Sequence, residues 1–329
     1  MTERALSNAP HSLRFAAEGR GRSADRTLGA IGAGAAGALG LVLVGVAVSV
    51  ARIAWPSIRA TGAALVVGHV WDPSRGSYGA LAFVWGTIFT SFIALALAVP
   101  IGLGVAVFLT DLGPRRLRKP VSSLVELLAA IPSVVYGLWA ALVLAPLIRE
   151  TLGPEPNVLG GVLFRGPNMG FGVLCASLVL AIMLLPTVAS VSRDVMRAVP
   201  AELREGALAL GATPWDVVRL VVLPHARQGI LGAILLGFGR AVGETMAVAA
   251  VVGSRAELSL SLLSPAYTMS SVIANEFPVA SSEIHVGALA EIGLLLFSLT
   301  LAFNIAARLL VARSTGDRAA LRPRAGARG

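Results

Sequence analysis

The sequence predicts an all-α membrane protein with six transmembrane helices. Of its 329 residues, 56% are hydrophobic and 14% are charged, whereas soluble proteins carry about 25% charged residues. Backbone groups in lipid must be hydrogen-bonded within their own segment, so a long apolar run is expected to be helical. Runs long enough to cross a bilayer, which takes roughly 20 residues, lie near 29–54, 81–110, 121–148, 171–192, 230–253 and 286–311.

Basic residues alternate between the polar segments and predict how the chain is oriented. Residues 1–28, 111–120, 193–229 and 312–329 hold five, four, five and five Lys or Arg, against two, two and one in 55–80, 149–170 and 254–285. Cytoplasmic segments are the more basic ones, so both termini and the loop 193–229 are expected in the cytoplasm. The net charge of +9 follows this distribution. Contact with anionic lipid headgroups accounts for it, and no nucleic acid is expected as a partner.

The polar ends are predicted to be tails around one membrane domain. Residues 1–28 and 312–329 are arginine-rich and lack a periodic apolar pattern, which is typical of disordered segments. We therefore expect a disordered cytoplasmic tail over 1–28, a transmembrane domain over 29–311 and a second cytoplasmic tail over 312–329.

The sequence shows no pattern of residues for nucleotide or metal binding. A nucleotide-binding P-loop needs a lysine followed by Ser or Thr, but the single lysine, Lys119, is followed by Pro120. The four histidines lie far apart, without the spacing of metal ligands. The sequence thus predicts no catalytic residues, no metal site and no cofactor in this chain, and any energy it uses must come from another chain or from a gradient.

The loop between the fourth and fifth runs contains the segment EGALALGATPWDVVRLVVLP, residues 205–224. It is expected to form a short helix, a turn at Gly211, which can adopt the conformation needed there, and a second helix. Thr213 is a suitable cap for that second helix, with Pro214 at its first position. Its valines form an apolar face that suits a groove in a soluble partner. An amphipathic helix lying on lipid is the alternative.

This loop resembles the coupling loop of bacterial ABC-type importer permeases, whose pattern is E-A-A-x3-G-x9-I-x-L-P. The departures from the pattern are Gly206 and Val221, where Ala and Ile are usual. The resemblance implies docking on a separate ATP-binding subunit through the matching residues Glu205, Ala207, Gly211, Leu223 and Pro224.

The fifth run carries ionisable residues within its apolar sequence. Arginine at the centre of a span costs roughly 2.5–3.5 kcal/mol, so Arg240 is expected to face the bundle interior with a partner. Glu244 lies four residues on, on the same face of a continuous helix. Guanidinium binds phosphate oxygens through two parallel hydrogen bonds. We therefore expect Arg240 to line an anion path and Glu244 to hold it when the path is empty; a permanent structural ion pair is the alternative.

Residues 237–254, GFGRAVGETMAVAAVVGS, and 127–139, LLAAIPSVVYGLW, resemble the C-type permease subunits of bacterial phosphate importers, the PstC family. The resemblance extends from about 81 to 311 and implies the type I importer permease fold in the bacterial inner membrane. It places Arg240, Glu244 and Thr245 on the substrate path.

The resemblance also implies a set of partners. They are two ATP-binding subunits that hold ATP and Mg, a homologous A-type permease subunit and an extracytoplasmic phosphate-binding protein. The chain would then be a non-catalytic permease subunit that forms half of a phosphate path. Alternatives left open are a permease for sulfate or molybdate, a gradient-driven transporter without an ATPase, and a membrane scaffold or sensor.

Overall fold

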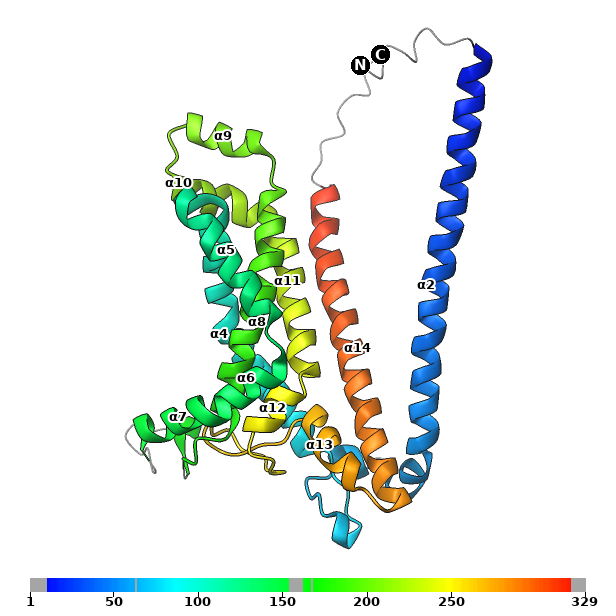
Figure 1. Cartoon of the computed structure of the whole chain (residues 1–329), viewed down its shortest axis with the longest axis vertical. Coiled ribbons are helices and arrows are strands. Elements are labelled where there is room, and N and C mark those ends of the chain that lie inside the picture. The colour runs from blue at the N-terminus through cyan, green and yellow to red at the C-terminus, as the bar shows by residue number, and fades with distance from the viewer. Residues whose placement is uncertain (1–10, 63, 154–161, 167, 321–329) are drawn as a thin grey trace. The chain divides into compact units, whose positions relative to one another are not determined.

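The computed structural model describes residues 11–62, 64–153, 162–166 and 168–320. These residues are almost entirely helical (Figure 1). The α-helices are α2 (His11–Thr61), α3 (Ala64–Val67), α4 (Leu81–Val107), α5 (Arg115–Ala130), α6 (Ser133–Trp139), α7 (Ala145–Leu152), α8 (Val173–Arg197), α9 (Ala201–Ala209), α10 (Pro214–Asp216), α11 (Leu223–Gly243), α12 (Met246–Val251), α13 (Met269–Glu276) and α14 (Glu283–Ala320).

Shorter helical segments join or extend these helices. Three are π-helical and continue an α-helix directly: η2 (Phe108–Leu112), η3 (Ala140–Leu144) and η6 (Val217–Val222). The others are 3₁₀ turns: η1 (Pro73–Arg75), η5 (Val162–Phe164) and η7 (Phe277–Val279).

The predicted fold class is confirmed. Within the described residues there is no strand, and six helical segments are long and apolar enough to cross a membrane. These segments are Leu28–Thr61, Leu81–Leu112, Ser133–Leu152, Val173–Arg197, Pro214–Gly243 and Glu283–Leu309.

Both expected tails are partly helical. Helix α2 begins at His11, within the predicted disordered tail 1–28, and α14 continues to Ala320, within the predicted tail 312–329. Both stretches lack proline and are rich in Ala and Arg, which favour helix and extend one already formed by an apolar span. Residues 1–10 and 321–329 lie outside the described residues.

The predicted third span, 121–148, merges two separate helices. Helix α5 ends at Ala130, and α6 begins only at Ser133. The reason is Pro132, which keeps the preceding residue out of the helical conformation; Ile131 has ψ 127°. Tyr136 re-ties the two helices, since its hydroxyl donates to the Leu128 carbonyl at 2.9 Å.

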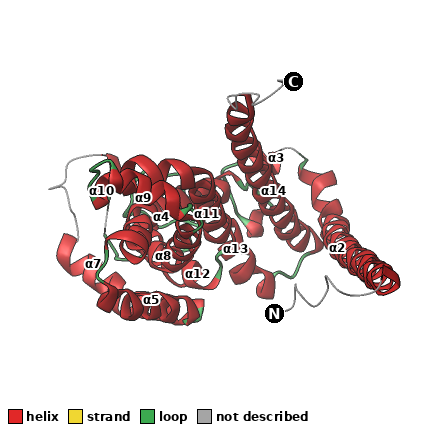
Figure 2. Cartoon of the chain, turned by 90° about the horizontal axis from the view of Figure 1, so that it is seen from above, coloured by secondary structure: helices red, strands yellow, loops and turns green. Residues whose placement is uncertain are grey.

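The described residues divide between Ile53 and Ala54 into two compact units. The first contains the N-terminal part of α2. In the second unit α4, α8 and α11 pack together (Figures 1 and 2), and their contact holds a core of small and branched side chains. Gly237 allows this close approach, because a Cβ there would meet Val188 Cγ2 at 3.3 Å and Leu95 Cδ2 at 3.5 Å.

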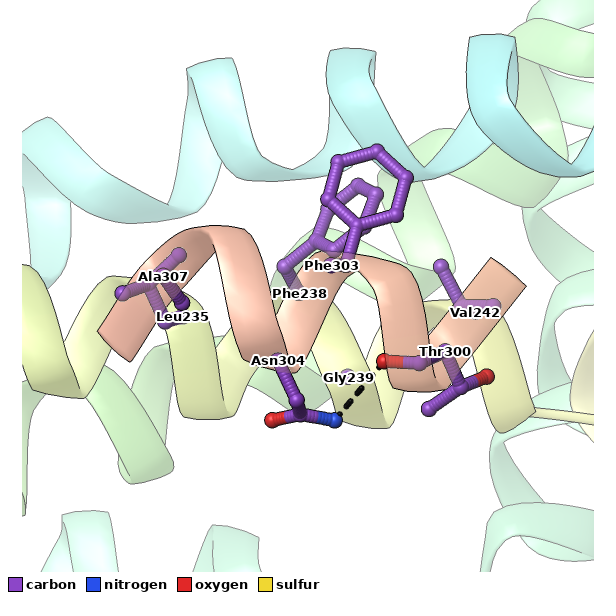
Figure 3. A pocket seen from close by; sticks show the side chains of 8 residues that line it. All are labelled: Leu235, Phe238, Gly239, Val242, Thr300, Phe303, Asn304 and Ala307. Carbon is purple, nitrogen blue, oxygen red and sulfur yellow. Dashed lines mark hydrogen bonds between the residues drawn. The ribbon is translucent and has the colours of Figure 1, made fainter. Parts of the chain in front are cut away.

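Helix α14 packs along α11 through the residues drawn in Figure 3. The rings of Phe238 and Phe303 lie 4.3 Å apart, centroid to centroid. Asn304 donates to the Thr300 carbonyl at 2.9 Å on its own helix. The gap left between the two helices is about 10 Å³, which is about the space of one water molecule. This contact is packing and leaves no room for a substrate.

Candidate functional site: the 201–224 segment and the break in the fifth span

The 201–224 segment, which contains the predicted loop 205–224, folds as a helix, a turn and a second helix, as predicted for 205–224. Helix α9 ends at Ala209, and Gly211 turns the chain with φ +88°, a conformation that side chains other than glycine rarely adopt. Thr213 then caps the next helix. Its Oγ1 accepts from the Asp216 amide at 3.2 Å, and Asp216 Oδ2 accepts from the Thr213 amide at 3.0 Å. This reciprocal capping box fixes where the second helix starts.

The valine face of the second helix is buried inside this chain. Val217, Val218 and Val222 are 5%, 0% and 0% exposed, in a cluster with Val107 of α4 and Met196 of α8. The expectation that these valines fill a groove in a partner is therefore wrong. The ends of α4 and α8 already cover them, and burial within the chain is the more favourable use of that apolar area.

The segment also carries large apolar side chains that are exposed. Leu208, Leu210 and Trp215 are 49%, 91% and 53% exposed, and Leu203 is 45% exposed. We call these four residues the exposed leucine face. Several exposed apolar side chains within one short segment indicate a candidate interaction surface.

The five residues that match the coupling-loop pattern have different environments. Ala207 and Leu223 are partly buried against the valine cluster, and Gly211 makes the turn. Glu205 and Pro224 are exposed. Three of the matching positions thus shape and anchor the segment, and two lie on its surface.

An ion pair that no sequence pattern indicated joins α9 to the end of the second span. Arg204 Nη1 lies 2.6 Å from Asp111 Oδ1 in η2, with 22% and 13% of the two side chains exposed. Arg204 Nη2 also donates to the Met196 carbonyl at the end of α8, at 2.6 Å. Arg118 holds the Asp111 carbonyl at 3.1 Å. We call the Arg204–Asp111 pair the latch. Through it Arg204 connects α9 to η2, which continues α4, and through the Met196 carbonyl it connects α9 to α8.

The fifth span is broken at Glu244 and Thr245, where a continuous helix was expected. Helix α11 ends at Gly243, Glu244 has ψ 129°, and α12 begins at Met246. The carbonyl of Glu244 is freed from helical bonding and accepts from Ser270 Oγ at 2.7 Å. Its carboxylate accepts from the Ala247 amide at 3.4 Å, and Thr245 Oγ1 donates to the Gly243 carbonyl at 3.2 Å. Broken helices at this depth are tolerated only where protein or water satisfies the backbone.

Arg240 lies in the last turn of α11, on an exposed face of the described chain. It donates to Thr187 Oγ1 of α8 at 3.2 Å. The expected location inside this chain's own bundle is therefore wrong. So is the expected pair with Glu244, since the ion pairs of the described residues include none between them. The helix ends between the two residues, so the four-residue spacing no longer places them on one face.

The family described as "Binding-protein-dependent transport system inner membrane component" matches residues 98–316, which include the 201–224 segment and Arg240. The chain belongs to this family. The family resemblance predicted from the sequence is confirmed, and so is a multi-pass protein of the inner membrane.

Two bacterial permease proteins are similar to the chain over most of its length. It is 43% identical over 288 residues to the phosphate transport system permease protein PstC of Mesorhizobium japonicum, covering 85% of this chain and 88% of that protein. It is 44% identical over 279 residues to the protein of the same name from Haemophilus influenzae, covering 83% and 88%.

A solved structure shares the fold. The inward-facing MetNI methionine ABC transporter superposes with a TM-score of 0.54 at 21% identity, over 71% of this chain and 94% of that one. At this identity the similarity concerns the fold alone. The ABC importer permease fold expected from the sequence is confirmed.

Proposed function

We propose that this chain is the permease subunit of an ATP-driven importer of inorganic phosphate and forms half of the translocation path. The observation that supports a path here is the position of Arg240, a permanently charged side chain on an exposed face of a membrane span. A charge at that depth must meet water or protein. A path between this chain and a second, homologous permease subunit would supply both.

Phosphate as the substrate is supported by the relatives and by the chemistry of the guanidinium. The relatives at 43% and 44% identity carry the name phosphate transport system permease protein. Arg240 keeps its charge and offers two parallel donors to an oxyanion. Among the described residues, its hydrogen-bond partner is the neutral hydroxyl of Thr187, at 3.2 Å, which a passing anion can displace.

Glu244 and Thr245 shape the path rather than neutralise Arg240. The helix is broken at these residues, so the Glu244 carbonyl lies outside the helical hydrogen-bond ladder. Ser270 holds the Glu244 carbonyl in place. A carboxylate near the path, not paired to Arg240, would hinder an anion from remaining bound.

Energy enters through the exposed leucine face of the 201–224 segment. The chain itself has a single lysine and no P-loop, and we assign the binding of ATP and Mg to two partner subunits, with this chain as a non-catalytic permease. One of those subunits docks on the exposed leucine face and on Glu205. The segment and both termini lie in the cytoplasm, and an extracytoplasmic phosphate-binding protein delivers the substrate at the opposite end.

The test is uptake of labelled phosphate by the complete complex in proteoliposomes. We expect uptake that needs both ATP inside and the binding protein outside, with excess phosphate competing and excess sulfate not competing. Uptake without ATP would contradict the ATPase partners and favour a gradient-driven transporter. Equal competition by sulfate or molybdate would contradict the substrate and leave the ABC permease intact.

A further inference from the structure

A second arginine-bearing region lies at the end of the subunit opposite α9, where Figure 1 shows α7 and α12. A cavity of about 490 Å³ is lined there by Arg149 of α7, Phe171, and Ala250, Ser254 and Arg255 at and beyond the end of α12. An adjoining hollow of about 520 Å³ shares Arg149 and Phe171. We call this cavity the arginine bowl.

The arginine bowl is basic, although its side of the protein holds few basic residues. Segments on this side hold few basic residues, yet Arg149 and Arg255 line one cavity. The Arg149 guanidinium makes no hydrogen bond or ion pair with any part of the chain that the structure describes. Arg255 is paired with Glu257 at 3.3 Å, with 68% and 49% of the side chains exposed, so the pair is weak. Glu150 borders the adjoining hollow.

The backbone that carries Arg255 is held in an uncommon conformation. Ser254 has φ +52° and is the one residue other than glycine with positive φ among those described. The Arg255 amide donates to the Ala266 carbonyl at 3.3 Å, and Asn275 Nδ2 donates to Ser254 Oγ at 3.3 Å. Strained backbone that is held by its surroundings tends to occur at functional sites. The backbone position of Arg255 is thus set by a fixed turn.

The bowl is continuous with the span that carries Arg240. Helix α12 runs from the break at Glu244 and Thr245 to the bowl, and Ala250 near its end lines the cavity. One broken span therefore connects two regions that present guanidinium groups. Paired guanidiniums suit a tetrahedral oxyanion, since each can donate two parallel hydrogen bonds.

We propose that the arginine bowl is an outer binding site for a phosphate oxyanion, occupied before the anion reaches Arg240. This role rests on the proposed phosphate path. Neither Arg149 nor Arg255 belongs to the motifs that resemble the importer permeases, so the cavity and its charges alone carry the site. A phospholipid headgroup presents the same oxyanion as free phosphate, and the two sources are separated by measuring with and without lipid.

The test uses a thiol placed in the bowl of the assembled complex, in detergent and in lipid nanodiscs. Ala250→Cys supplies the thiol, and the same complex without it supplies the background, because Cys175 is fully buried. The rates of modification by an anionic and a cationic methanethiosulfonate reagent are compared, with inorganic phosphate or chloride at equal ionic strength.

We expect the anionic reagent to react faster, and inorganic phosphate to slow both reagents where chloride does not. Arg149→Gln with Arg255→Gln should lower the anionic-to-cationic rate ratio by about fivefold, as expected for removing two charges near the thiol, and abolish protection by phosphate. Arg75→Gln is the control: its side chain is 83% exposed on the same side but outside the bowl, and it should change neither.

An unchanged anionic-to-cationic rate ratio in the double variant would overturn the proposal. So would protection of the thiol that requires phospholipid and is not produced by inorganic phosphate. Uptake gives a second readout: the double variant should raise the KM for phosphate several-fold and leave kcat nearly unchanged. The thiol assay does not depend on transport. Loss of phosphate uptake with phosphate protection intact would therefore refute the path, and with it the outer role, but would leave the bowl as an oxyanion-binding site.

Discussion

The 201–224 segment and the Glu244–Thr245 break differ in how tightly the protein holds them. The segment is held against the rest of the chain by buried valines and by the Arg204–Asp111 latch. Among the described residues, the exposed leucine face takes no part in these contacts and is open to solvent or a partner. The break is held by single hydrogen bonds, such as Ser270 to the Glu244 carbonyl. A part that transmits force must move with the spans, whereas a part that passes a substrate must rearrange at little cost.

Breaking the latch should have the largest effect. Asp111→Ala leaves Arg204 without its charged partner. Removing one member of a buried pair costs about 3–5 kcal/mol, and partial exposure reduces this to about 2 kcal/mol. We expect a lower thermal unfolding midpoint of the purified complex and ATP hydrolysis that is no longer matched by uptake.

The control for the latch is Asp194→Ala. Asp194 pairs with Arg193 at 3.3 Å but is 66% exposed, so its loss should change the midpoint little. Equal effects of Asp111→Ala and Asp194→Ala would contradict a role for the latch in fastening the segment.

Charging the exposed leucine face should weaken docking without unfolding the chain. Leu210 is 91% exposed, so Leu210→Glu removes little packing within the subunit. A charge buried in an apolar interface should lower co-purification of the ATP-binding subunit at least tenfold, about 1.4 kcal/mol. Leu258→Glu, at a leucine that is 49% exposed beyond α12, is the matched control and should co-purify normally.

The turn at Gly211 should tolerate substitution less well than its open surroundings suggest. A Cβ there would meet nothing within 4 Å, but φ is +88°. Gly211→Ala should therefore cost about 1 kcal/mol through backbone strain alone. A reduced uptake rate with unchanged subunit composition is the expected result; a fully active variant would indicate that the turn conformation is dispensable.

Replacing Gly206 should have the smallest effect, and it should stabilise the segment rather than destabilise it. It lies within α9, and a Cβ added to it would have no other atom within 4 Å, so Gly206→Ala should favour the helix by up to about 1 kcal/mol. We expect unchanged or slightly higher uptake and slower amide exchange in α9. Faster exchange would contradict a simple helix at this position.

Features encoded by neighbouring residues could be predicted from the sequence. Gly211, Thr213 and Pro214 specify a turn and a helix start over a few residues, and the structure forms both there. The six spans followed from long apolar runs for the same reason, although Pro132 divides the third run at a place where its apolar composition alone did not indicate a break.

Features that depend on distant residues could not be predicted. Asp111 and Arg204 are separated by 93 positions, and no local pattern marks them as partners. The break after Gly243 is stabilised by Ser270, on a segment 26 residues beyond Glu244. Because nothing in the local sequence marks Ser270 as that partner, the spacing of Arg240 and Glu244 predicted one continuous helical face.

The most direct measurement is phosphate uptake per ATP hydrolysed by the complex that carries Arg240→Gln. It separates the role of Arg240 in the path from the role of the 201–224 segment in coupling. We predict that the complex assembles and hydrolyses ATP while uptake is lost, because the guanidinium lines the path but does not fasten the 201–224 segment. Arg227→Gln, an exposed arginine on the same helix, should keep normal uptake. Full phosphate uptake by the Arg240→Gln complex would contradict a path lined by this arginine.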